Sequence, residues 1–243
     1  MRHALRLAVT ATVLATIGCS GFGETTEPAT GSRTITKNTG DGQAARVATA
    51  VAIAPSVKVT DAGGKPLAGV TVAFSASNAG IVTLGARVTD ANGIATVGSW
   101  TLGEASGTNT LTAATGGAES VQFTATGLAG PAIEMVKLTG DPVPGTAGQP
   151  VATRPSIRLR DSFQNGVPGI AVTFEVAAGG GTITGGTTTT DANGVATVGS
   201  WTLGNPGVNT LAVTAAGNGI ANNPGSFTAN AASSAAVIVI RRP

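Results

Sequence analysis

Short stretches of alternating apolar and polar residues recur along this 243-residue chain. Residues 56–60 alternate between polar side chains and valine, and Val70, Val72 and Phe74 occupy every second position of a later stretch. An apolar period of two predicts β-strands that bury one face. Beyond the amino-terminal segment, no stretch keeps a convincing 3.6-residue apolar period. The pattern therefore predicts strands throughout and no amphipathic helix.

The alternating pattern is written twice. Residues 55–61 (PSVKVTD) return as 155–161 (PSIRLRD), and residues 89–103 return almost unchanged as 190–204. A period of about 100 residues is the length of a whole domain, whereas solenoid repeats have units of roughly 20–50 residues. We therefore predict two tandem copies of one domain.

Turn-forming residues separate the predicted strands. An Asp-Ala-Asn-Gly tetrad occurs at 90–93 and again at 191–194. Asp and Asn side chains bond to local backbone and Gly tolerates a positive φ, so both tetrads are typical of tight turns. Short strands with frequent turn signals over about 100 residues predict an antiparallel β-sandwich. The fold class we expect is all-β, with immunoglobulin-like sandwiches at 33–130 and 131–235 and an extra strand or tail at 236–243.

The first 18 residues have the layout of a secretory signal peptide. A basic start precedes an apolar run at 7–17 that is too short to span a bilayer as a mature helix. The Cys19-Ser20 pair that follows resembles the lipobox of bacterial lipoproteins, so we expect residues 1–18 to be cleaved and Cys19 to carry lipid. An ordinary secretory signal that leaves Cys19 as a free thiol is the alternative. Residues 19–32 are small and polar, which predicts a flexible tether.

Removal of the signal peptide changes the charge balance. The whole chain has 14 basic and 12 acidic residues, and Arg2 and Arg6 account for the difference, so the mature chain is formally neutral. A neutral chain with 3% aromatic residues lacks the basic footprint that nucleic-acid binding requires. Because the chain has one cysteine, a disulfide framework cannot stabilise it.

Few side chains of the mature chain suit catalysis. The single histidine, His3, lies in the signal peptide, which excludes a Ser–His or Cys–His nucleophile pair and a histidine-ligated zinc site. Paired carboxylates of a hydrolase remain an alternative, and the acids at strand ends are Asp61, Asp90, Asp161 and Asp191. The same oxygens suit calcium, but the tetrads lack the further acidic positions of the usual loop. We therefore assign turn formation to these acids, and no catalytic residue, metal or cofactor.

Trp100 and Trp201 occupy matching positions in the repeated segment Val-Gly-Ser-Trp-Thr-Leu-Gly. We interpret each as an anchor of its sandwich core, because each shares a strand face with a leucine two residues later. The alternative is a pair of exposed indoles that stack on sugar rings, which would make the chain a carbohydrate-binding accessory module.

The order of motifs carries a resemblance to a known family. Gly-Asp at 40–41 is followed by Val-Lys-Val-Thr-Asp at 57–61, Pro-Leu-Ala-Gly-Val-Thr-Val-Ala-Phe at 66–74 and Thr-Asp-Ala-Asn-Gly-Ile-Ala at 89–95. This succession resembles the bacterial immunoglobulin-like repeat of the invasin and intimin group, and it covers most of the mature chain twice. The resemblance implies a stalk or adhesin module on a bacterial surface.

These observations together predict a non-enzymatic, surface-displayed module. We expect a secreted protein that is attached to the membrane by a lipid on Cys19, at the outer membrane or cell surface. Ser20 is similar to the residue found after the cysteine in lipoproteins sent to the outer membrane. A surface protein or a polysaccharide is the expected ligand, nucleic acid is not, and the sequence specifies no oligomeric state.

Overall fold

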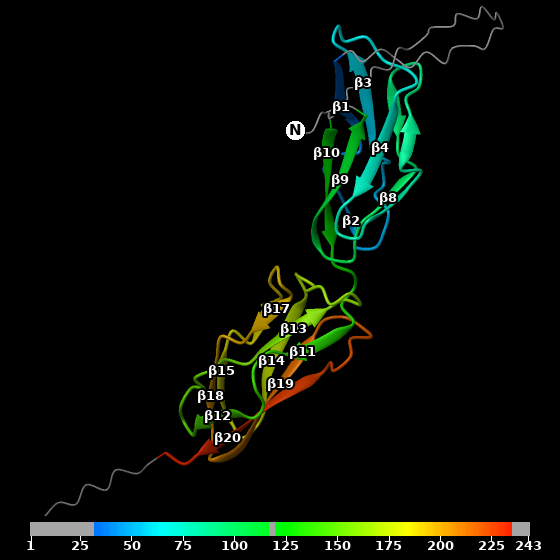
Figure 1. Cartoon of the computed structure of the whole chain (residues 1–243). Coiled ribbons are helices and arrows are strands. Elements are labelled where there is room, and N and C mark those ends of the chain that lie inside the picture. Colours follow the sequence, from blue (N-terminus) through cyan, green and yellow to red (C-terminus); the bar gives the residue numbers. More distant parts are fainter. Residues whose placement is uncertain (1–31, 117–119, 235–243) are drawn as a thin grey trace, which may run out of the picture. The chain divides into compact units, whose positions relative to one another are not determined.

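A computed structural model describes residues 32–116 and 120–234. Every regular element in these ranges is a β-strand, which confirms the all-β fold class predicted from the alternating pattern. The described ranges contain no helix that is long and apolar enough to cross a membrane. Figure 1 shows the strands gathered into two groups, one for each sequence repeat.

Ten strands form in the first repeat, and they make three sheets. The orders are β1-β3-β7 in a three-stranded sheet, β2-β10-β9-β4-β6 in a five-stranded sheet, and β5-β8 in a pair. The bounds are β1 (Arg33–Thr39), β2 (Gln43–Arg46), β3 (Ser56–Asp61), β4 (Thr71–Ala76), β5 (Ile81–Thr83), β6 (Ala86–Val88), β7 (Ile94–Thr96), β8 (Ser99–Thr101), β9 (Gly107–Thr115) and β10 (Ser120–Leu128).

The second repeat has the same sheet orders in its ten strands. They are β11-β13-β17, β12-β20-β19-β14-β16 and β15-β18. The bounds are β11 (Glu134–Lys137), β12 (Val143–Thr146), β13 (Ser156–Arg160), β14 (Ala171–Ala178), β15 (Gly181–Thr184), β16 (Thr187–Thr189), β17 (Val195–Thr197), β18 (Ser200–Leu203), β19 (Gly207–Ala215) and β20 (Gly225–Ala232).

One strand pair in each repeat differs from the antiparallel arrangement that the sequence predicts. β2 lies parallel to β10, and β12 lies parallel to β20. Between β1 and β2 the chain passes from the three-stranded to the five-stranded sheet without a reversing hairpin, so β2 meets β10 in parallel. Gly40 makes this crossing with a φ of 84°, and a Cβ there would lie 2.7 Å from Pro55 Cα. Only glycine fits both demands.

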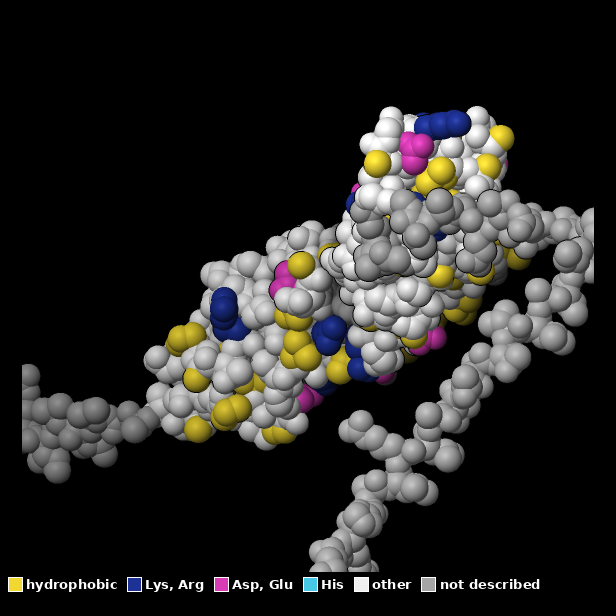
Figure 2. Space-filling model, turned by 45° about the horizontal axis from the view of Figure 1, so that its top comes forward, with side chains coloured by type: hydrophobic (Ala, Val, Ile, Leu, Met, Phe, Trp, Pro, Cys, Tyr) yellow, Lys and Arg dark blue, Asp and Glu magenta, His cyan; other side chains and the backbone are white. Residues whose placement is uncertain are grey.

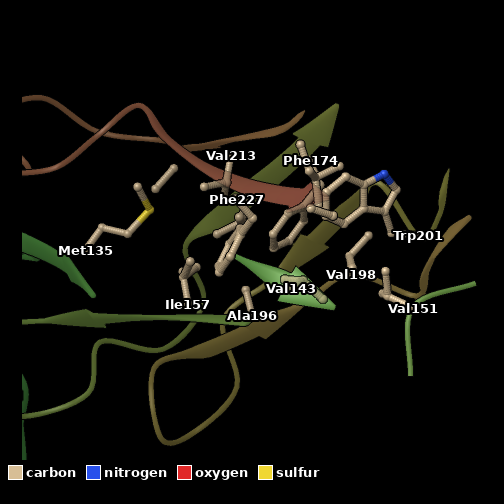
Figure 3. Close-up of a cluster of buried hydrophobic side chains, with 14 of the residues drawn as sticks. Met135, Val143, Val151, Ile157, Phe174, Ala196, Val198, Trp201, Val213 and Phe227 are labelled. Atoms are coloured by element: carbon tan, nitrogen blue, oxygen red, sulfur yellow. The ribbon is translucent and has the colours of Figure 1, made fainter. Parts of the chain in front are cut away.

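The buried apolar residues form two clusters that share no residue. One cluster runs from Ile35 to Ala125 and the other from Met135 to Ala231. Figure 3 shows the second cluster, in which the rings of Phe174, Phe227 and Trp201 lie among aliphatic side chains. Each cluster lies between sheets of its own repeat, as period-two strands require.

Candidate functional site

Both tryptophans belong to the buried apolar cluster of their own repeat. Trp100 in β8 and Trp201 in β18 each have an exposed fraction of 0%. Val82 of β5 pairs with Trp100, and Ile183 of β15 pairs with Trp201, so each tryptophan has an aliphatic cross-strand neighbour that packs against the same cluster. Both Nε1 atoms are buried without a hydrogen-bond partner among the described residues. Stacking on a sugar ring needs an exposed ring face, and neither indole has one in this structure.

The tetrad aspartates hold tight turns. Asp90 Oδ1 accepts hydrogen bonds from the amides of Asn92 at 2.8 Å and Ile94 at 2.9 Å. Asp191 accepts the equivalent pair of amides in the second repeat. Gly93 follows with a φ of 74°. The geometry is that of an Asx-type turn, which is the role that the sequence predicts for these acids.

Asp161 and Asp61 end equivalent strands but have different surroundings. Asp61 accepts two amides of its own turn at Oδ1. Asp161 has an exposed fraction of 0%. Its Oδ1 accepts hydrogen bonds from the backbone amides of Phe163 and Asn165. Its Oδ2 accepts hydrogen bonds from the Gly130 amide and from Asn165 Nδ2. Burial raises the pKa of Asp161, but hydrogen bonds from Asn165, Gly130 and Phe163 outweigh it, so the pKa lies below its ordinary value.

A further acid, Asp141, was not singled out by the sequence as a functional residue. It forms an ion pair with Lys137 and accepts the backbone amide and hydroxyl of Thr228 at Oδ1. Burial raises the pKa of Asp141, while the bonds from Lys137 and Thr228 lower it to a net value below the ordinary one. The Lys137 ammonium also lies 5.2 Å from the Phe227 ring centroid. Asp41 has the equivalent position in the first repeat, where it pairs with Lys37 and accepts the Thr124 amide. A lysine four residues before an aspartate occurs in both repeats, and this spacing is the sequence signal that could have identified the ion pair.

A groove of about 460 Å³ lies beside β11 in the second repeat. Its walls include Met135, Lys137 and Asn222. The groove's carboxylate, Glu134, pairs with Arg160 at 2.7 Å. Within the described ranges, no three His, Cys, Asp or Glu side chains gather as a metal site would require. Because Glu134 is the one acid among the described residues that line it, the groove brings together no pair of acids of the hydrolase type.

Charged side chains are sparse on the surface. Figure 2 shows a face made mostly of backbone and uncharged polar groups, with lysine, arginine and acidic side chains scattered over it. The remaining candidate, Cys19, lies outside the described residues, as do the predicted signal peptide, nearly all of the tether and the segment 236–243. Lipidation of Cys19 stays a prediction.

Two sandwiches with this strand order define an immunoglobulin-like all-β protein. No protein-family model and no curated protein matches the chain. Among solved structures it is similar to InvD of Yersinia pseudotuberculosis, with a TM-score of 0.59 and 20% identity over 82% of this chain and 58% of that chain. The likeness to InvD shows the fold, so the resemblance to the invasin and intimin group is confirmed at the level of fold.

Two further solved structures align less closely. The Escherichia coli adhesin FdeC aligns with a TM-score of 0.47 and 20% identity, over 83% of this chain and 65% of that chain. Invasin, described as a bacterial integrin-binding protein, aligns with a TM-score of 0.40 and 26% identity, over 84% of this chain and 40% of that chain. This chain thus spans less than two thirds of each of these three structures.

Proposed function

We propose that this chain is a non-enzymatic module of a bacterial surface, with a structural or adhesive role that depends on its shape and contact surface. The observation that carries the proposal is that the strand-end aspartates accept hydrogen bonds from backbone amides of their own turns. Asp61, Asp90, Asp161 and Asp191 are the strand-end carboxylates that a hydrolase could use, and each binds backbone amides of its own turn. Side chains committed to holding turns support a scaffold function.

The proposed module is secreted and attached to the outer membrane or cell surface by a lipid on Cys19. The support is the Gly18-Cys19-Ser20 signature after an apolar run of signal-peptide length. A tether of about 13 residues could extend to roughly 40 Å, enough to hold a sandwich clear of lipid headgroups. A surface protein or a polysaccharide is the proposed ligand.

Metabolic labelling tests the anchor. Labelled palmitate is expected to enter the wild-type protein, which should fractionate with membranes. Cys19→Ala should take up no label and should stay unprocessed or become soluble. Equal labelling of both proteins would overturn the anchoring part of the proposal.

Capture from intact cells tests the contact role. Cells that display the chain are treated with a surface cross-linker, and the chain is purified with whatever it has bound. We expect a cross-linked protein or polysaccharide that is absent from cells lacking the chain. Asp90→Asn keeps the Oδ1 acceptor and should capture the same material, whereas a carboxylate-dependent activity would be lost in this variant. No captured material from the displaying cells would contradict the adhesive role.

A further inference from the structure

The groove beside β11 has one wall that is longer in the second repeat than its counterpart in the first. Nine residues, 216–224, join β19 to β20, whereas four residues, 116–119, join β9 to β10. Ala221 of the longer loop bonds to β11 in both directions. Its amide donates to Ile133 O at 2.8 Å, and its carbonyl oxygen accepts from Met135 N at 3.0 Å. The 216–224 loop is therefore attached along the edge of β11.

Two amide side chains hold the 216–224 loop in place. Asn223 Nδ2 donates to Ala215 O at 2.8 Å, and Asn223 Oδ1 accepts the Ala215 amide at 2.9 Å. Asn222, which lines the groove, donates from Nδ2 to Met135 O at 3.3 Å. A wall that is held by such bonds is formed before a ligand arrives, which lowers the entropic cost of binding.

The outer edge of β11 borders the groove. β11 is the end strand of its sheet in the described ranges. The backbone N–H and C=O of Met135 point to the outer edge, where they bond to Ala221 and Asn222. Alternate residues of a strand direct these groups to the same edge, so those of Lys137 point there too, past the last bond of the loop. Lys137 lines the groove and offers this main-chain donor and acceptor to an added strand.

The beginning of β20 presents a second strand edge. β12 pairs with β20 from Ala229 onward. The amide of Thr228 points to that side as well, where it donates to Asp141 Oδ1 at 2.8 Å. Ser226, which lines the groove, lies ahead of both residues, and its N–H and C=O point to the same edge. An extended peptide in the groove could bond to main chain on both sides, as in β-strand addition.

The groove has an apolar floor of ligand-binding size. Met135 is 4% exposed and Val213 is 1% exposed, and both belong to the cluster drawn in Figure 3. The volume of about 460 Å³ lies within the roughly 300–1,000 Å³ of ordinary ligand pockets. The described lining residues include no aromatic ring on which a sugar could stack. These features favour a peptide over a polysaccharide.

The charged residues that line the groove are two cations and one acid. They are Lys137, Arg160 and Glu134. Arg160 donates from Nη2 to Glu134 at 2.7 Å, and its Nε has no hydrogen-bond partner among the described residues. The Lys137 side chain stays 39% exposed although it pairs with Asp141, which lies outside the lining. The excess of positive charge favours an acidic group on the ligand.

We infer that the groove beside β11 binds an extended peptide segment of a partner protein, with an acidic side chain near Lys137 and Arg160 and an apolar side chain against Met135. The inference rests on the proposed contact role and names protein as the class of partner. Side chains of an extended peptide alternate between two faces, so one segment can direct apolar groups to the floor while its main chain pairs with β11.

Peptide selection on a soluble chain of residues 20–243 tests the inference, because this form lacks only residues outside the described structure. Phage that display random heptapeptides are selected on the immobilised chain, and enriched peptides are synthesised and titrated by fluorescence anisotropy. We expect peptides that combine Asp or Glu with large apolar residues, with dissociation constants on the order of 10–100 μM that rise with salt. No enrichment, or enrichment of peptides without an acid, would overturn the inference.

Matched lysine variants test whether the peptide occupies the groove. Lys137→Gln should weaken binding about tenfold, because it removes one of the two cations. Lys37→Gln removes the equivalent ion pair of the first repeat and should bind like wild type. Hydrogen exchange of the Lys137 amide should slow when peptide is bound, because an added strand gives this amide an acceptor. Equal binding by the two variants, or unchanged exchange at Lys137, would contradict a strand added to β11.

Alginate, an acidic polysaccharide, is the competing probe. It should bind no more tightly to wild type than to Lys137→Gln. Alginate binding that depends on Lys137, without any enriched peptide, would reject the peptide and assign the groove to a polysaccharide. Capture from intact cells separates this inference from the proposed function. Material captured equally by wild type and Lys137→Gln would retain the contact role and reject the groove as its site.

Discussion

At the scale of single residues, each core depends on one tryptophan. Trp100 and Trp201 are fully buried, and replacement by alanine would leave a cavity that the surrounding sheets cannot fill. Trp100→Ala and Trp201→Ala should each lower the free energy of unfolding of their own repeat by about 3–5 kcal/mol. Denaturant titration measures the loss, with Val208→Ala as an exposed control. A near-zero loss, together with strong acrylamide quenching of the wild-type fluorescence, would favour the sugar-stacking role.

Asp61 and Asp161 end equivalent strands, but replacement by asparagine should affect the stability of the protein differently at the two positions. In Asp161→Asn, a side-chain NH₂ group replaces the oxygen that accepts the Gly130 amide. Two hydrogen-bond donors, this NH₂ group and the Gly130 N–H, would then face each other in a buried place. The loss should be about 1–3 kcal/mol at pH 7. Asp61→Asn keeps the Oδ1 acceptor that both of its amides use, so it should cost less.

The pH dependence follows from the direction of the shift. The pKa of Asp161 is lower in the folded than in the unfolded protein, so its stabilisation is complete above the unfolded pKa of about 3.9 and is lost as the pH falls through the folded value. Wild-type unfolding free energy should fall more steeply than that of Asp161→Asn below about pH 4. Parallel curves for the two proteins in that range would rule out this role.

At the scale of elements, two turns of the first repeat contain glycine in different surroundings. Gly93 has a φ of 74°, and a Cβ there would lie 2.5 Å from the Val59 carbonyl oxygen. Gly64 has a φ of 81° but no atom within 4 Å of a Cβ. Gly64→Ala should therefore cost about 1–2 kcal/mol from its conformation alone. Gly93→Ala should cost roughly 2 kcal/mol more, because the neighbouring strand must also move. Equal melting points for the two variants would show that close approach is unimportant.

The strands were predictable wherever one face is buried. Val57, Val59 and the tryptophans follow from period two and from the duplication, because core burial selects the same residue types in both repeats. The parallel position of β2 was not predictable, since the passage of the chain from one sheet to the other leaves no periodic signal. The bond from the Gly130 amide to Asp161 was also beyond the sequence, because it joins residues that only the fold brings together. The bonds from Phe163 and Asn165 belong to the turn that the sequence predicts for this acid.

At the scale of the whole molecule, the duplicated sequence corresponds to a duplicated topology. Each repeat has its own three-stranded, five-stranded and two-stranded sheets. Each also has its own apolar cluster, and no residue belongs to both. A hydrophobic core that is complete within one repeat is the physical requirement for independent folding. We therefore expect each sandwich to fold by itself, and two such sandwiches are the central element of the proposed surface module.

Separate expression of residues 33–130 and 131–235 tests this account most directly. Each fragment should give a strand-rich far-UV spectrum with almost no helix, and each should unfold cooperatively with its own buried tryptophan protected from acrylamide. Trp100→Ala should destabilise the first fragment and leave the unfolding of the second repeat in the intact chain unchanged. If neither fragment folds alone, the two repeats depend on a shared core, and the modular account is contradicted.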